Sequence, residues 1–167
     1  MTDRAQPDSR HLGDPGTADF QVERYPFYLL NRTASRYNAL IEAELRRVGL
    51  DVPYWRVLMI LGETMPLGVN RIAEAAVINL STMMRIVQRM TRDGLVAVAP
   101  SARDARVTEV SLTSAGQAKL AAARAITTPI YARVIAGFSE RDFDRLRLLL
   151  NRLHDNLAAL DRDDRVP

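Results

Sequence analysis

Two short helical segments joined by a tight turn, with a pair of short strands directly after them, constrain this chain more than any other feature. Residues 69–76 are rich in alanine, the turn falls at 77–79, and the second helical pattern runs to residue 92. Asn79 stands where this second helix would begin, and its side-chain oxygen suits an N-cap. Two helices joined in this way predict a helix-turn-helix.

The second helix has one apolar face and one cationic face. Apolar side chains recur there at helical spacing, at Met83, Ile86, Val87 and Met90. The other side carries three arginines and no acidic residue between residues 79 and 92. A capped, short and cationic helix suits the major groove of duplex DNA. The residues that we expect to contact DNA from this helix are Ser81, Thr82, Arg85, Gln88 and Arg89.

Arg85 and Arg89 suit two kinds of DNA contact, because a guanidinium group can fork to a guanine edge or clamp a phosphate. Both alternatives stay open at this point. An ordinary solvated helix face is the competing interpretation, but the cap, the spacing and the missing acids favour DNA. No aromatic residue lies between residues 56 and 130. Stacking on single-stranded nucleic acid is therefore not expected from this region, and duplex DNA is favoured.

A hairpin follows the cationic helix after Gly94. Residues 95–99 and 106–112 have the pattern of two strands, and in the second one Val110 and Leu112 alternate with Ser111. The expected fold is therefore mainly α, a winged helix-turn-helix with a two- to three-stranded wing. The wing adds three candidate DNA contacts, Arg103, Asp104 and Arg106. The competing interpretation is a surface turn with an ion pair worth ~0.5 kcal/mol.

Long helical patterns flank the winged segment on both sides and complete the predicted architecture. They carry more apolar surface than one winged helix can cover, which predicts pairing with a second copy of the chain. The expected divisions are a flexible N-terminal arm over residues 1–21, a helical dimerisation region over 22–50 and 114–160, a DNA-binding lobe over 51–113 and a frayed tail over 161–167.

Composition limits the function classes. The chain has 167 residues, a net charge of +3 and no cysteine, and its pI is about 9.7. This charge permits a polyanionic partner without demanding one. No secretory signal and no apolar run of membrane-spanning length are found, so a cytoplasmic protein without membrane contact is expected. The catalytic patterns Ser–His–Asp, HExxH, P-loop and GxGxxG are missing, so we expect no enzyme, no cofactor and no metal.

The residues in this order resemble the MarR family, the multiple-antibiotic-resistance-type bacterial regulators. The resemblance covers roughly residues 25–160. Its most specific part is the wing pattern, an Asp-x-Arg at Asp104 and Arg106, then Val-x-Leu-Thr over 110–113, then Gly116. The second helix matches through Ser81, Thr82, Arg85 and Arg89. Ala105 departs from the family, many of whose members carry a basic residue there.

The resemblance implies an obligate homodimer whose terminal helices form the interface and whose two winged lobes hold a palindromic operator. It also implies a repressor that a small anionic or phenolic ligand releases. By the same resemblance, Arg106 enters the minor groove and Asp104 holds it in place.

A ligand site is expected near the aromatic-rich segment, since seven of the ten aromatic residues fall between residues 20 and 55. An aromatic carboxylate is the favoured effector. The candidate residues are Tyr28, Asn31, Arg32, Ser35, Arg36, Trp55 and Met59. The competing interpretation is that the aromatics form a dimer core and the arginines form ion pairs.

These observations together predict a dimeric, ligand-responsive transcriptional regulator, a repressor, that binds a pseudo-palindromic duplex operator. The alternative is a helical-dimer module that binds a protein partner and has no DNA function.

Overall fold

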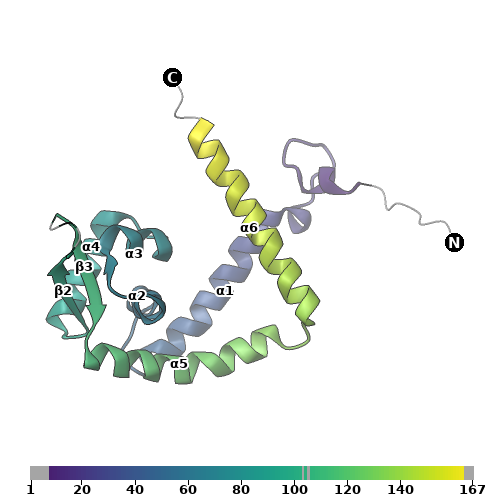
Figure 1. Ribbon diagram of the computed structural model, residues 1–167. Coiled ribbons are helices and arrows are strands. Elements are labelled where there is room, and N and C mark those ends of the chain that lie inside the picture. The colour runs from purple at the N-terminus through teal and green to yellow at the C-terminus, as the bar shows by residue number, and fades with distance from the viewer. Residues whose placement is uncertain (1–7, 103, 105, 164–167) are drawn as a thin grey trace. The chain divides into compact units, whose positions relative to one another are not determined.

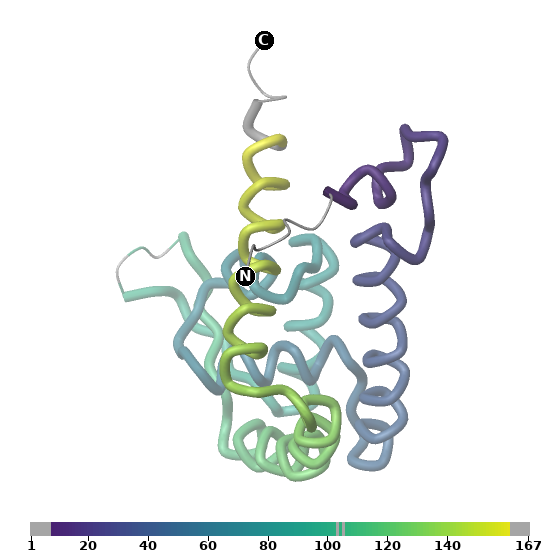
Figure 2. The backbone as a smooth tube through the Cα atoms, turned by 90° about the vertical axis from the view of Figure 1, so that its right-hand side faces the viewer, coloured from purple at the N-terminus to yellow at the C-terminus, as the bar shows by residue number. Residues whose placement is uncertain are grey.

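The computed structural model describes residues 8–102, 104 and 106–163, and Figures 1 and 2 show it from two sides. The chain divides into two compact units, Met1–Thr127 and Thr128–Pro167. Arg103, one of the expected DNA contacts, lies outside the described residues.

The first unit is the expected winged helix-turn-helix together with the helix before it. Its elements in order are α1 (Pro26–Arg46), α2 (Val52–Glu63), β1 (Leu67–Gly68), α3 (Val69–Ala76), α4 (Leu80–Arg92), β2 (Val96–Pro100), β3 (Thr108–Leu112) and the first part of α5 (Ser114–Ile135). Figure 1 shows α2, α3 and α4 gathered beside the small sheet. Core residues with no exposed surface come from α1, α2, α3, α4, β3 and α5, and include Ile41, Leu45, Leu58, Leu61, Ile72, Met83, Met90, Val110 and Ala123.

The wing is a three-stranded antiparallel sheet in the order β1-β3-β2. Val96 pairs with Leu112 and Ala97 with Ser111 across the hairpin. Leu67 pairs with Val110 on the other side of β3. The sequence pattern predicted two of these strands, β2 and β3, and the structure adds β1 as the third, within the expected two to three strands.

Side-chain caps fix the starts of two helices. The Asp51 carboxylate accepts a hydrogen bond of 2.7 Å from the backbone N–H of Tyr54 at the start of α2. The Asn79 side chain accepts one of 2.8 Å from the N–H of Thr82 at the start of α4. Each bond satisfies an N–H group that has no partner inside its own helix. The Asn79 cap confirms the sequence-based prediction and sets where the cationic helix begins.

The N-terminal segment differs from the prediction. Residues 10–13 and 22–24 form the 3-10 helices η1 (Arg10–Gly13) and η2 (Val22–Arg24), and the Gln21 N–H donates to the Leu12 carbonyl at 2.8 Å. Figure 2 shows this segment in dark purple next to the start of α1. The first long helix accordingly begins at Pro26 rather than near residue 22, because a proline is favoured in the first turn of a helix.

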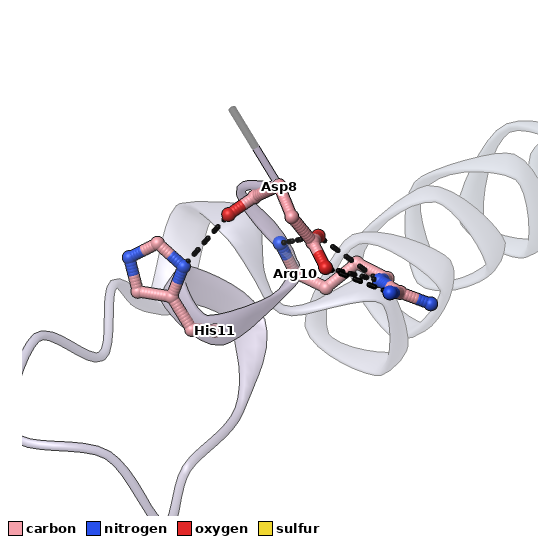
Figure 3. Close-up of polar contacts among 3 residues, drawn as sticks. All are labelled: Asp8, Arg10 and His11. Atoms are coloured by element: carbon pink, nitrogen blue, oxygen red, sulfur yellow. Dashed lines mark hydrogen bonds and ion pairs between the residues drawn. The ribbon is translucent and has the colours of Figure 1, made fainter. Parts of the chain in front are cut away.

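A small polar cluster begins the described chain. The Asp8 carboxylate accepts bonds from Arg10 Nε at 2.9 Å and Arg10 Nη2 at 2.7 Å, and His11 Nδ1 lies 3.0 Å from the Asp8 carbonyl oxygen (Figure 3). The hydrogen bonds from Arg10 lower the pKa of Asp8 to about 2. Both charged groups face solvent, so this pair contributes little to stability.

The second unit consists of the end of α5 and α6 (Glu140–Asp163). Ser139 and Asp142 form a capping box, in which the Asp142 N–H donates to Ser139 Oγ at 3.2 Å and the Ser139 N–H donates to Asp142 Oδ2 at 3.2 Å. Several leucines of α6 are left uncovered by their own unit, namely Leu146, Leu148, Leu149, Leu150, Leu157 and Leu160. Among the described residues, no helix is long and apolar enough to cross a membrane.

Candidate nucleic-acid interface

Helix α4 separates an apolar face from a polar one, as its sequence predicted. Met83, Ile86, Val87 and Met90 are at most 4% exposed. The residues expected to contact DNA all lie on the exposed side, and they are Ser81, Thr82, Arg85, Gln88 and Arg89. Met84 is also on the surface, with half of its side chain exposed. These four buried side chains pack the helix against the core, and its cationic side remains exposed for a ligand.

The centre of the exposed face carries charge that the rest of the described chain does not neutralise. Arg85 and Arg92 form no ion pair with any described residue. Exposed arginines on other helices do have partners, as Arg46 has in Glu42 at 2.6 Å. Unpaired guanidinium groups keep their donors available for phosphate or base edges. Arg92 was not among the residues expected to contact DNA. Its spacing of seven residues from Arg85 nevertheless places it on the same exposed side of α4.

The wing presents Arg106 to solvent on a turn that Asp104 builds. The Asp104 carboxylate accepts a bond of 3.0 Å from the Arg106 backbone N–H, and the Asp104 carbonyl accepts one of 2.9 Å from Val107. The Arg106 guanidinium lies 3.8 Å from the Asp104 carboxylate and its side chain is 94% exposed. Asp104 therefore orders the backbone that carries Arg106, while the charged end of Arg106 extends from the wing.

A contact between α2 and α4 adds a residue that the sequence did not suggest. The Tyr54 hydroxyl donates to Asp93 Oδ2 at 2.8 Å, and the Arg89 guanidinium carbon lies 5.3 Å from the centre of the Tyr54 ring. Burial, and then the hydrogen bond to Asp93, raise the pKa of Tyr54 to about 12. The phenol thus stays protonated at neutral pH and keeps donating to Asp93.

A shallow groove runs between α4 and the wing on the opposite flank of the helix. Its volume is about 530 Å³. It is lined by Val69, Met84, Val87, Gln88, Thr91, Arg92, Val98 and Thr108. Gln88 and Arg92 thereby face the wing side of α4, whereas Arg89 faces α2.

A second hollow of about 600 Å³ lies among α1, α2 and the end of α3. It is lined by Ala34, Tyr37, Asn38, Trp55, Arg56, Met59, Ile60, Ala75, Ala76 and Val77. Two of the expected ligand residues, Trp55 and Met59, are in this set. The other five do not line this hollow, namely Tyr28, Asn31, Arg32, Ser35 and Arg36.

Polar groups in this hollow suit an anionic aromatic molecule. Trp55 Nε1 is buried and has no hydrogen-bond partner within the described chain. Arg56 Nη1 donates to the Ala76 carbonyl at 3.3 Å, a long bond, and the guanidinium has no ion-pair partner among the described residues. Burial raises the pKa of Tyr37, and the nearby Arg56 charge opposes that rise. Arg56 follows Trp55 directly in the sequence, but only the packing of α2 on α1 shows that this arginine borders the hollow.

Comparisons with known proteins agree with this geometry. A model of the MarR family matches residues 48–107. The chain is 39% identical over 147 residues to the HTH-type transcriptional repressor IacR of Pseudomonas putida, covering 88% of each chain. It is 31% identical over 106 residues to the homoprotocatechuate degradative operon repressor of Escherichia coli, covering 64% of this chain and 72% of the relative.

A solved structure supports the same similarity. The transcriptional regulator MOSR of M. tuberculosis, determined in complex with DNA, superposes with a TM-score of 0.68 at 27% sequence identity. The match covers 81% of this chain and 97% of that one.

Proposed function

Because the chain belongs to the MarR family, we propose that it is a homodimeric transcriptional repressor that binds a pseudo-palindromic duplex operator and leaves it when a small aromatic acid binds. The observation that carries the proposal is the free cationic face of α4 beside a wing that exposes Arg106. A repressor of this kind acts where the chromosome lies, so we place it in the cytoplasm. The family consists of regulators, and we assign the chain no catalytic activity.

The dimer is proposed from uncovered apolar surface. Leu148 and Leu160 of α6 are 63% and 61% exposed, and Tyr131 and Phe138 near the end of α5 are about half exposed. Monomeric proteins rarely leave so much apolar surface in contact with water. We therefore propose that residues 22–50 and 114–160 form the dimerisation region and that residues 51–113 form the DNA-binding lobe. A two-fold dimer would present two α4 helices to two half-sites of one operator.

Replacement of Arg106 tests the DNA function. Full-length protein is expected to shift duplex DNA from upstream of its own gene in a gel assay. Arg106→Ala is expected to weaken that binding and to lower the slope of log K against log salt by about 0.9, the value for one lost phosphate contact. Fluorescence anisotropy over a salt series measures both quantities.

Asp104→Asn is the matched control for the wing. An asparagine oxygen can still accept the bond from the Arg106 N–H, so the turn should keep its shape. Affinity is expected to stay the same or to rise slightly, because a negative charge has gone. Unchanged affinity and salt slope in Arg106→Ala would remove the wing from the interface, and no shift by the unmodified protein at low salt would favour the protein-interaction module instead.

The effector is proposed to bind the hollow that Trp55 and Arg56 border. An aromatic carboxylate would accept from the unpaired Trp55 Nε1–H and pair with Arg56, while Met59 and Ile60 cover its ring. A buried N–H without a partner is costly, so a ligand that accepts its hydrogen bond gains that energy on binding. The degradative-operon repressor of Escherichia coli, named for an aromatic acid, supports this ligand class.

A thermal-shift titration tests the hollow. Homoprotocatechuate, benzoate and phenylacetate are the probes, and at one hundred times its Kd a ligand is expected to raise the melting temperature by roughly 5 °C or more. Trp55→Phe should reduce the shift because it removes the N–H but keeps an aromatic ring. Arg56→Gln should reduce it further by removing the charge.

Arg32→Gln is the matched control, since Arg32 lies over the Tyr28 ring at 5.8 Å and does not line the hollow. Its ligand-induced shift is expected to equal that of the unmodified protein. If Arg32→Gln loses the shift and Arg56→Gln keeps it, the carboxylate binds elsewhere on α1 and the assignment to Arg56 is wrong.

A further inference from the structure

Arg89 is held differently from the other exposed arginines of α4. Its guanidinium carbon lies 5.3 Å from the centre of the Tyr54 ring. The Tyr54 hydroxyl is in turn fixed by its 2.8 Å bond to Asp93, the residue that ends α4. Both the Arg89 side chain and the C-terminal end of α4 are therefore tied to the first turn of α2. Arg85 and Arg92 have no such contact within the described chain.

The direction of each side chain around α4 separates Arg89 from Arg85. With about 100° of rotation per residue, Arg85 lies nearly opposite the buried stripe, while Arg89 is turned further toward α2. Gln88 and Met84 are turned the other way and line the groove on the wing side. A helix in the major groove presents its outermost face to base edges. Its two flanks face the phosphate backbones that border the groove.

Position along the helix points the same way. Residues near the start of a recognition helix reach base edges most directly. Arg85 belongs to the first half of α4, whereas Arg89 lies in its last turn. Because Arg89 lies on a flank of α4 and in its last turn, its guanidinium would lie at the border of the DNA major groove, on the side of α2.

We propose that Tyr54 is a positioning residue that holds Arg89 at this border, where Arg89 binds a backbone phosphate of the operator and leaves base reading to Arg85. This inference rests on the proposed function, because it divides roles within the DNA interface. A ring contact suits this task better than an ion pair would. It restrains the guanidinium by its face and leaves the N–H donors at its edge free for an anion.

The surroundings of Arg89 meet the requirements of such an arrangement. No carboxylate of the described residues lies within ion-pair distance of its guanidinium, so phosphate would have no paired acid to displace. The nearby Asp93 carboxylate is engaged by Tyr54 and held on the α2 side. A side chain that is already restrained loses less conformational entropy when it binds.

Binding of the full-length protein to two duplexes tests the proposal. One duplex is the tightest binder selected by the unmodified protein from a random library, and the other is a scrambled duplex of equal length and composition. Arg89→Ala is expected to lose roughly tenfold in affinity on both duplexes, as for one charge-assisted hydrogen bond. Its slope of log K against log salt should fall by about 0.9.

Tyr54→Leu is expected to lose roughly two- to fivefold on both duplexes, the effect of one cation–π contact, together with part of the salt slope. Tyr54→Phe keeps the ring and should lose less, which provides a second variant if the leucine protein folds poorly. In the Arg89→Ala background, Tyr54→Leu should have no further effect on affinity or slope. A merely structural role for Tyr54 would not change the salt slope.

Three results would overturn the proposal. A loss confined to the selected duplex in Arg89→Ala would make Arg89 a base reader. Unchanged affinity and slope in both Tyr54 variants would remove the positioning role, and so would additive losses in the double variant. These results differ from failure of the proposed function itself, in which the unmodified protein would bind neither duplex even at low salt.

Discussion

Gly116→Ala is expected to lower the free energy of unfolding by roughly 2–3 kcal/mol, the cost of forcing a methyl group into a packed site. A Cβ at residue 116 would meet the backbone carbonyl oxygen of Leu95, and beyond it the Leu112 side chain. The carbonyl belongs to the chain between α4 and β2 and cannot turn aside as a side-chain end can. In an uncrowded helix the same change would raise the free energy of unfolding by about 1 kcal/mol. A decrease would therefore indicate that the added methyl group meets the Leu95 carbonyl.

The close approach at Gly116 joins the DNA-binding elements to α5. The Leu95 carbonyl accepts a bond of 3.1 Å from the Thr113 N–H. Thr113 Oγ1 donates to the Gly94 carbonyl at 2.6 Å and accepts from the Gly116 N–H at 3.0 Å. Thr113 and Gly116 thus hold the end of α4 and the start of the wing against the first turn of α5. This arrangement explains why a threonine and a glycine are needed at this spacing.

Gly62→Ala is the matched control, because Gly62 is also a helical glycine with a close neighbour. Its added Cβ would meet the end of the Leu120 side chain, which can change rotamer. The free energy of unfolding is expected to stay within about 1 kcal/mol of the unmodified value. Urea denaturation at one fixed protein concentration measures both variants, since the stability of a dimer depends on concentration. Gly116→Ala that is as stable as Gly62→Ala would contradict the expected backbone contact.

Local sequence patterns predicted the elements that local interactions build. The caps at Asp51 and Asn79 depend on residues three positions away, and the buried face of α4 follows from helical spacing. Strand β1 escaped prediction because two residues carry no pattern of their own. It exists through pairing with β3, more than forty residues later in the chain. The 3-10 helices η1 and η2 escaped prediction because each is a single short turn, with too few residues to show a helical period in the sequence.

The sequence predicts the residues of a candidate site when they lie on one helix, but it does not predict which residues meet when helices pack together. Arg85 and Arg89 both have the composition and spacing of DNA contacts, and nothing local separates them. What distinguishes Arg89 from Arg85 is its contact with Tyr54. Tyr54 lies 35 residues earlier in the sequence and contacts α4 only because α2 packs against it. The aromatic-rich segment likewise indicated Trp55. The arginine next to the hollow is Arg56 rather than Arg32 or Arg36, because the packing of α1 on α2 decides which side of α1 faces inward.

Arg85→Ala is expected to lower affinity for the selected operator by 1–3 kcal/mol, roughly 5- to 150-fold, and to change affinity for a scrambled duplex much less. Arg85 is exposed, unpaired within the described chain and nearly opposite the buried stripe of α4. A guanidinium in that place can donate two bonds to a guanine edge, and a wrong base leaves those donors without acceptors. Fluorescence anisotropy with the two duplexes at one salt concentration measures the ratio of the affinities.

Arg46→Ala separates this effect from the loss of one positive charge. Arg46 lies on α1, 74% exposed, and pairs with Glu42 rather than with any residue of α4. Its removal changes net charge by the same amount and should alter both affinities less than about twofold, because exposed charges far from DNA are screened by salt. Equal losses on the two duplexes in Arg85→Ala would make Arg85 a phosphate contact. Base reading would then fall to the side chains that flank it on the same face, Ser81 and Gln88.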